Sequence, residues 1–133
     1  MKIKIITILV LLTVLSLSGC SFSSSSVSAT TEPDAIAYEM ATLDNGEISK
    51  DDPVINEYKI FLDRIEDKTV SSRVNILNIT KTAQELLKEG GIDKTLLKIL
   101  KDFNSYIPEG PEGFKLEEVA LAYMIIMTEE KNK

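Results

Sequence analysis

Apolar residues recur along most of this chain at the three- and four-residue intervals of an α-helix. Such spacing places them on one face, which a helix in a globular protein buries against its neighbours. No segment shows the alternation of apolar and polar residues that a half-exposed strand requires. We therefore predict an all-α fold, a compact bundle of about five short helices. The apolar positions of the first four are Ile36, Met40 and Leu43; Ile55, Tyr58, Leu62 and Ile65; Ile76, Ile79, Ala83 and Leu86; and Leu96, Ile99, Leu100 and Phe103.

The residues between these segments are of the kinds that begin and end helices. Ser49, Ser72 and Asp93 each precede an apolar segment, where a side-chain oxygen can accept from a free backbone N–H group. Gly46 and the Gly90-Gly91 pair follow such segments, where a glycine can take the left-handed conformation that ends a helix. These signals predict where the second, third and fourth helices start and where the first and third stop.

The last predicted helix covers about residues 115–129. Its residues 119–127 are apolar on every side, and a helix of that kind is usually enclosed by its neighbours. We expect it to be the central helix of the core. The alternative is that one of its faces, including Met124 and Met127, is covered by a partner or by a second copy of the chain.

The first twenty residues follow a different pattern. Lys2 and Lys4 precede residues 5–17, a run that is apolar apart from two threonines and one serine. A short cationic start, an apolar core and an exit of small residues are typical of a secretory signal peptide. The run is shorter than the roughly 20 apolar residues that a membrane-spanning helix needs. We expect residues 1–19 to be this signal peptide.

The run closes on Leu17-Ser18-Gly19-Cys20, which includes the only cysteine of the chain. This sequence resembles the lipobox of bacterial lipoprotein precursors. The resemblance implies that a diacylglyceryl group is attached to the sulfur of Cys20 and that cleavage follows Gly19. Two or three acyl chains on one cysteine are expected to hold a protein durably on a membrane, because one chain alone binds only marginally.

The remainder divides into a tether and a domain. Residues 20–31 are rich in serine and threonine, cannot bury enough apolar area to offset their ordering entropy, and are predicted to form a flexible tether. Residues 32–133 are expected to form one small acidic helical domain, since about 100 residues suffice for one core and not for two. The resemblance places the protein at the cell membrane, outside the cytoplasm, or at the outer membrane if the organism has one.

Charge and composition exclude several functions. The leader holds two of the 15 basic residues and none of the 21 acidic ones, so the mature charge is 13 − 21 = −8. Nucleic acid is not an expected partner, because its binding depends on basic residues that neutralise phosphates. There is no histidine, and a lipidated Cys20 would leave no thiol. The commonest catalytic bases, nucleophile pairs and zinc ligands are therefore missing, and we predict no enzyme, no cofactor and no metal site.

Acidic residues are the only catalytic or metal-binding groups left to consider. Asp51 and Asp52, or Glu109 and Glu112, are the only plausible carboxylate pairs for an enzyme. The acidic segment around Gly46 also suggests a calcium loop. Aligning Gly46 with the sixth position of an EF-hand puts alanine and leucine where the first and third ligands belong, so that motif fails.

Residues 107–113 hold two prolines and two glycines and should not be helical. Loops of this kind often carry function, and an aromatic residue stands at each side. We read the segment as a rigid connector between helices, with a partner-binding loop as the alternative, and it is the first candidate for a site. The candidate site residues are Tyr106, Pro108, Glu109, Pro111, Glu112 and Phe114.

The predicted function is a non-catalytic binding module, lipid-anchored at the cell envelope, with an unknown envelope protein as its partner. One version is a lipoprotein related to a phage or mobile element that intercepts an incoming factor at the membrane. Another is an accessory subunit of an envelope complex. The alternative to a binding module is a carrier of a small ligand or lipid, with an apolar pocket between the helices.

Overall fold

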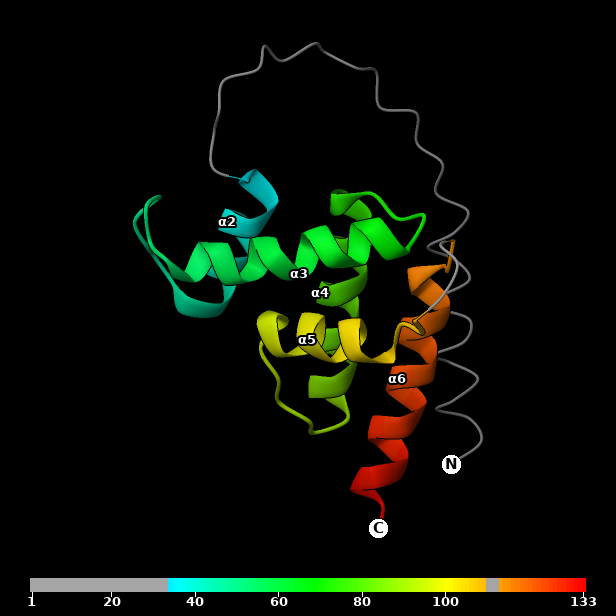
Figure 1. Ribbon diagram of the computed structural model, residues 1–133. Coiled ribbons are helices and arrows are strands. Elements are labelled where there is room, and N and C mark those ends of the chain that lie inside the picture. Colours follow the sequence, from blue (N-terminus) through cyan, green and yellow to red (C-terminus); the bar gives the residue numbers. More distant parts are fainter. Residues whose placement is uncertain (1–33, 110–112) are drawn as a thin grey trace, which may run out of the picture. The chain divides into compact units, whose positions relative to one another are not determined.

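The computed structural model describes residues 34–109 and 113–133, and the segments predicted as signal peptide and tether, with Cys20, lie outside this part. The described part is an all-α bundle, as predicted, with one isolated bridge between Thr69 and Phe114. It contains five helices, labelled as in Figure 1: α2 (Ala35–Asn45), α3 (Val54–Lys68), α4 (Arg73–Glu89), α5 (Leu96–Tyr106) and α6 (Leu116–Lys131).

Four of the five helices form two pairs that cross each other, and α2 packs against α3 (Figure 1). Helices α3 and α5 pack together and run in the same direction, as do α4 and α6. Two contacts mark the ends of the second pair. Asn75 Nδ2 donates to Glu117 Oε1 (3.2 Å) at the starts of α4 and α6, and Lys131 Nζ donates to the carbonyl oxygen of Gly90 at their ends.

The core is made from the apolar faces of all five helices. Helices α4 and α5 each contact all of the other four. Three aromatic side chains, those of Tyr58, Phe103 and Tyr123, are almost completely buried, and the rings of Phe103 and Tyr123 meet edge to face with centroids 5.4 Å apart. Each large apolar side chain removed from water contributes about 1.5–3 kcal/mol to folding, so this core shared by the five helices is the main source of stability.

The predicted positions of the last helix and of Leu43 in the core are wrong. Helix α6 packs mainly against α4 and α5, at one side of the bundle, and its Ile125 is 44% exposed. Met124, a candidate for a partner-covered face, is buried in the core. In α2 the buried residues are Ala37, Met40 and Ala41, whereas Leu43 is 52% exposed. The buried face of α2 runs through Ala37, Met40 and Ala41, and Leu43 lies outside that face.

Two of the three predicted N-caps are also wrong. Ser72 does cap α4, since its hydroxyl accepts from Asn75 N. Helix α3 begins after Pro53, and it is the carboxylate of Asp52 rather than Ser49 that accepts from Val54 N (3.0 Å). Helix α5 is capped by Thr95, two residues beyond Asp93.

One arginine connects the starts of α2 and α4 with the end of α3. The guanidinium of Arg73 contacts the carboxylates of Asp34 and Asp63, and its Nε lies 3.0 Å from Glu66. Asp34 also caps α2 by accepting from Ala37 N (3.2 Å). Arg73 therefore fixes the point at which the chain enters the domain.

Candidate functional site

The loop that holds the candidate partner-binding residues joins α5 to α6, and the structure describes only part of it. Pro108 is exposed, and the side chain of Glu109 is 98% exposed, with one ion pair to Lys68 (3.7 Å). Pro111 and Glu112 lie outside the described residues. The ring of Pro108 and the carboxylate of Glu109 are therefore accessible to a partner, and the fold depends little on either.

The two aromatic residues beside the loop have separate surroundings. Tyr106 is 39% exposed, and its ring lies 5.7 Å from that of Tyr123. Phe114 is partly buried against the core, and its carbonyl oxygen accepts from Val70 N (3.1 Å). The loop is thus anchored at one side on α6 and at the other on the turn between α3 and α4.

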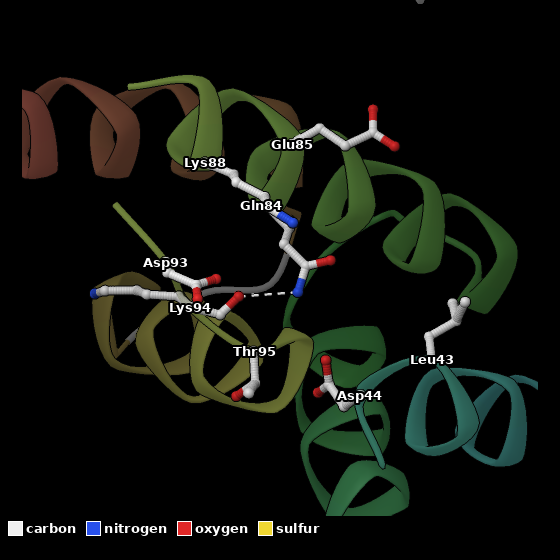
Figure 2. A pocket seen from close by; sticks show the side chains of 8 residues that line it. All are labelled: Leu43, Asp44, Gln84, Glu85, Lys88, Asp93, Lys94 and Thr95. Atoms are coloured by element: carbon white, nitrogen blue, oxygen red, sulfur yellow. Dashed lines mark hydrogen bonds between the residues drawn. The ribbon is translucent and has the colours of Figure 1, made fainter. Parts of the chain in front are cut away.

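A hollow that the sequence did not predict lies between the end of α2, α4 and the link into α5 (Figure 2). Its volume is about 410 Å³, and it is open to solvent. All but one of its lining side chains are polar or charged: Leu43, Asp44, Gln84, Glu85, Lys88, Asp93, Lys94 and Thr95. Gln84 Nε2 donates to the carbonyl oxygen of Lys94 (2.9 Å) across it. Such a hollow suits small polar groups better than a lipid.

Asp44, which lines this hollow, also caps helix α5. Its two carboxylate oxygens accept from Leu96 N (2.9 Å) and Leu97 N (3.0 Å), the first free N–H groups of α5. Negative charge at a helix N-terminus is stabilising. The hydroxyl of Tyr58 donates to the same carboxylate (2.6 Å). Burial, reinforced by this hydrogen bond and by the charge of Asp44, raises the pKa of Tyr58 and keeps the phenol neutral.

Asp102 of α5 holds a second polar cluster together. Its carboxylate accepts from Lys94 (2.8 Å), Lys98 (2.7 Å) and the hydroxyl of Tyr123 (2.9 Å). Burial works against ionisation of Asp102, but these hydrogen bonds outweigh it and lower its pKa. Burial, together with the hydrogen bond to Asp102, raises the pKa of Tyr123.

Lys94, which lies just before α5, also contacts α6. Its side chain is only 19% exposed, and its ammonium lies 5.2 Å from the ring centroid of Tyr123. Lys94 therefore connects the hollow to the packing between α5 and α6.

The remaining carboxylate candidates of the described part lie in two places, one at each end of α3. Asp51 and Asp52 belong to the turn before α3, where Asp52 is occupied by its bond to Val54 N, and Glu109 projects from the α5–α6 loop. Within residues 34–109 and 113–133, no three His, Cys, Asp or Glu side chains come together in a way that could hold a metal ion.

The described helices are also too short or too polar to cross a bilayer. Comparisons of the chain with protein-family models, with curated proteins and with solved structures give no match.

Proposed function

We propose that this protein is a bacterial lipoprotein, held at the cell envelope by lipid on Cys20. The observation that carries the proposal is the position of the only cysteine, directly after Leu17-Ser18-Gly19 at the end of the apolar run. The described helices include none that could replace a lipid anchor by spanning the membrane. With a mature charge of 13 − 21 = −8, attraction to anionic lipids would not hold the protein either.

Fractionation of cells tests the anchor. The wild-type protein should sediment with membranes and resist extraction with high salt, because acyl chains rather than charges hold it. Cys20→Ser should move it to the soluble fraction or leave it as an uncleaved precursor. Cys20→Ser protein that is cleaved and remains on the membrane as the wild type does would refute the lipid anchor.

The anchored domain is proposed to be a binding module without catalysis. The partly buried ionisable groups support this role, since Asp44, Asp102 and Arg73 are each occupied by contacts between helices. The open polar hollow differs from the enclosed apolar cavity that a lipid carrier would need. What the domain presents to a partner is the exposed loop that contains Pro108 and Glu109.

Crosslinking on intact cells followed by capture from membranes tests the binding role. We expect the wild-type lipoprotein to recover one envelope protein, and Glu109→Lys to lose it. Glu130→Lys makes the same charge change at an exposed site near the end of α6 and should keep the partner. A partner that both variants retain would move the binding site away from the loop. A lipid that remains with the purified protein, without any protein partner, would favour the carrier.

A further inference from the structure

Two exposed apolar side chains flank the start of α4. Val70 is 70% exposed and Val74 is 57% exposed, and they lie on either side of Ser72, the cap of that helix. We call them the Val70/Val74 patch. Isolated exposed apolar residues are common, so their exposure alone does not indicate a binding partner.

The patch lies at the end of the bundle where the chain enters the domain. Arg73 lies between the two valines in sequence and contacts Asp34, the first described residue of the domain. The backbone of Val70 is bonded to Phe114, just before α6 begins. The starts of α2, α4 and α6 therefore share one end of the bundle (Figure 1), and the patch lies at the end where the chain enters.

The chain before Asp34 limits how far this end can be from the membrane. Thirteen residues separate Cys20 from Asp34 in the sequence. Even fully extended, a chain of that length reaches only about 50 Å, and a flexible one averages roughly 20 Å. A domain of about 100 residues has a radius of gyration near 13 Å, so the entry end is the end that a lipid on Cys20 keeps closest to the bilayer.

We propose that the Val70/Val74 patch rests on the lipid bilayer and orients the domain, so that the ends of α4 and α6 point away from the membrane. This inference rests on the lipid anchor proposed at Cys20. Contact is made by the two valines rather than by charge, because acidic residues such as Glu66 and Asp63 surround Arg73 at this end. The tether makes contact effectively intramolecular, so that two side chains too weak to bind a membrane alone suffice.

The absence of tryptophan from the chain gives a direct test. Single variants Val70→Trp and Val74→Trp would each carry one reporter, with Leu43→Trp and Ile125→Trp as controls. The control sites are also exposed and apolar, but they lie at the far end of α2 and in the second half of α6. Each full-length variant is purified from bacterial membranes and reconstituted into phosphatidylcholine vesicles with and without a quencher on the acyl chains.

We expect quenching at positions 70 and 74 to exceed that at 43 and 125 several-fold. Equal quenching at all four positions, or none at any, would overturn the proposal. A blue shift at position 70 that grows with protein concentration and is insensitive to the quencher would assign the patch to a second copy of the chain, which also overturns it.

A second sample distinguishes a failure of the Val70/Val74 patch to contact lipid from a failure of the proposed anchor at Cys20. The same variants, started at Cys20 and coupled there to a maleimide lipid, carry an anchor whatever the cell does to the cysteine. Quenching at 70 and 74 in this sample alone would mean that the patch meets lipid but the native anchor is wrong. Absence of quenching here, with the native protein lipidated, would mean that the anchor is right and the patch is not.

Discussion

Asp44 is the side chain on which most of the polar structure between α2, α3 and α5 depends. It caps α5 from 52 residues away in sequence and accepts from Tyr58. Asp44→Ala should lower the free energy of unfolding by about 1–3 kcal/mol, because it removes a charged cap and leaves buried donors without an acceptor. Urea denaturation followed by circular dichroism measures this loss.

Asp93→Ala is the matched control for that variant. Asp93 is the cap that the sequence favours, yet it is exposed and Thr95 takes its place. Its replacement should change stability by less than about 0.5 kcal/mol. If Asp93→Ala lowered the free energy of unfolding as much as Asp44→Ala does, α5 would start where the sequence suggested.

Asp102 should make stability depend on pH. Its pKa in the folded protein is lowered by Lys94, Lys98 and Tyr123 against the cost of burial. The unfolded chain therefore binds the proton at higher pH than the folded one, and the stabilisation is present above about pH 4 and lost as the pH falls through the folded pKa.

Asp102→Asn tests this dependence. The variant should be about 1–3 kcal/mol less stable than wild type at pH 7, since Lys94 loses its partner. The difference should shrink between pH 4 and pH 2 in urea titrations at each pH. Asp67→Asn, at an exposed site, should stay close to wild type throughout. A difference for Asp102→Asn that is the same at every pH would contradict the account of Asp102.

At the residue scale the sequence identifies the local cap Ser72, misplaces the local caps of α3 and α5, and gives no sign of a cap that comes from another helix. Ser72 bonds to an N–H group three residues ahead, and propensity alone identifies it. The bonds from Asp44 to α5 exist only once α2 and α5 are packed together. The sequence could not predict the hollow for the same reason, because its lining residues come from three separate segments that meet only in the folded domain.

At the scale of elements, the end of α4 shows how a glycine stops a helix here. Gly91 has a φ of 77°, its N–H donates to Lys88 O (2.9 Å), and the N–H of Ile92 donates to Leu87 O (2.8 Å). These two bonds are the Schellman pattern, which favours glycine at the left-handed position.

Gly91→Ala should therefore destabilise the domain by about 1 kcal/mol, because a Cβ is disfavoured in that conformation. Thermal unfolding would show the loss as a lower midpoint. Gly91→Asn should be the milder change, since asparagine tolerates left-handed backbone better than alanine. Equal midpoints for wild type and Gly91→Ala would contradict the role assigned to Gly91.

The existence of a helix is easier to predict than its place in the bundle, as a comparison of α3 with α6 shows. The spacing of Ile55, Tyr58, Leu62 and Ile65 identifies both α3 and its buried face. In α6 nearly every residue from 119 to 127 is apolar, so the pattern cannot distinguish a central helix from one at the side. The position of α6 is decided by its neighbours, which the sequence of α6 does not encode.

At the scale of the whole molecule, residues Glu32–Lys133 form one compact unit. A fragment of these residues should unfold in a single cooperative transition, with the same urea midpoint as the chain that starts at Cys20. Far-ultraviolet circular dichroism with urea measures both. A fragment that begins at Val54, without α2 and Asp44, should lose cooperative unfolding. A midpoint for the 32–133 fragment well below that of the longer chain would mean that the preceding residues contribute to the fold.

The central claim is that lipid on one sulfur keeps this acidic helical domain at the cell envelope. Mass spectrometry of the protein purified from its own membranes tests it most directly. The account predicts that the chain begins at Cys20 and that this residue carries a diacylglyceryl group, a mass that Cys20→Ser lacks. An unmodified Cys20 thiol, or a chain that still carries residues 1–19, would contradict it.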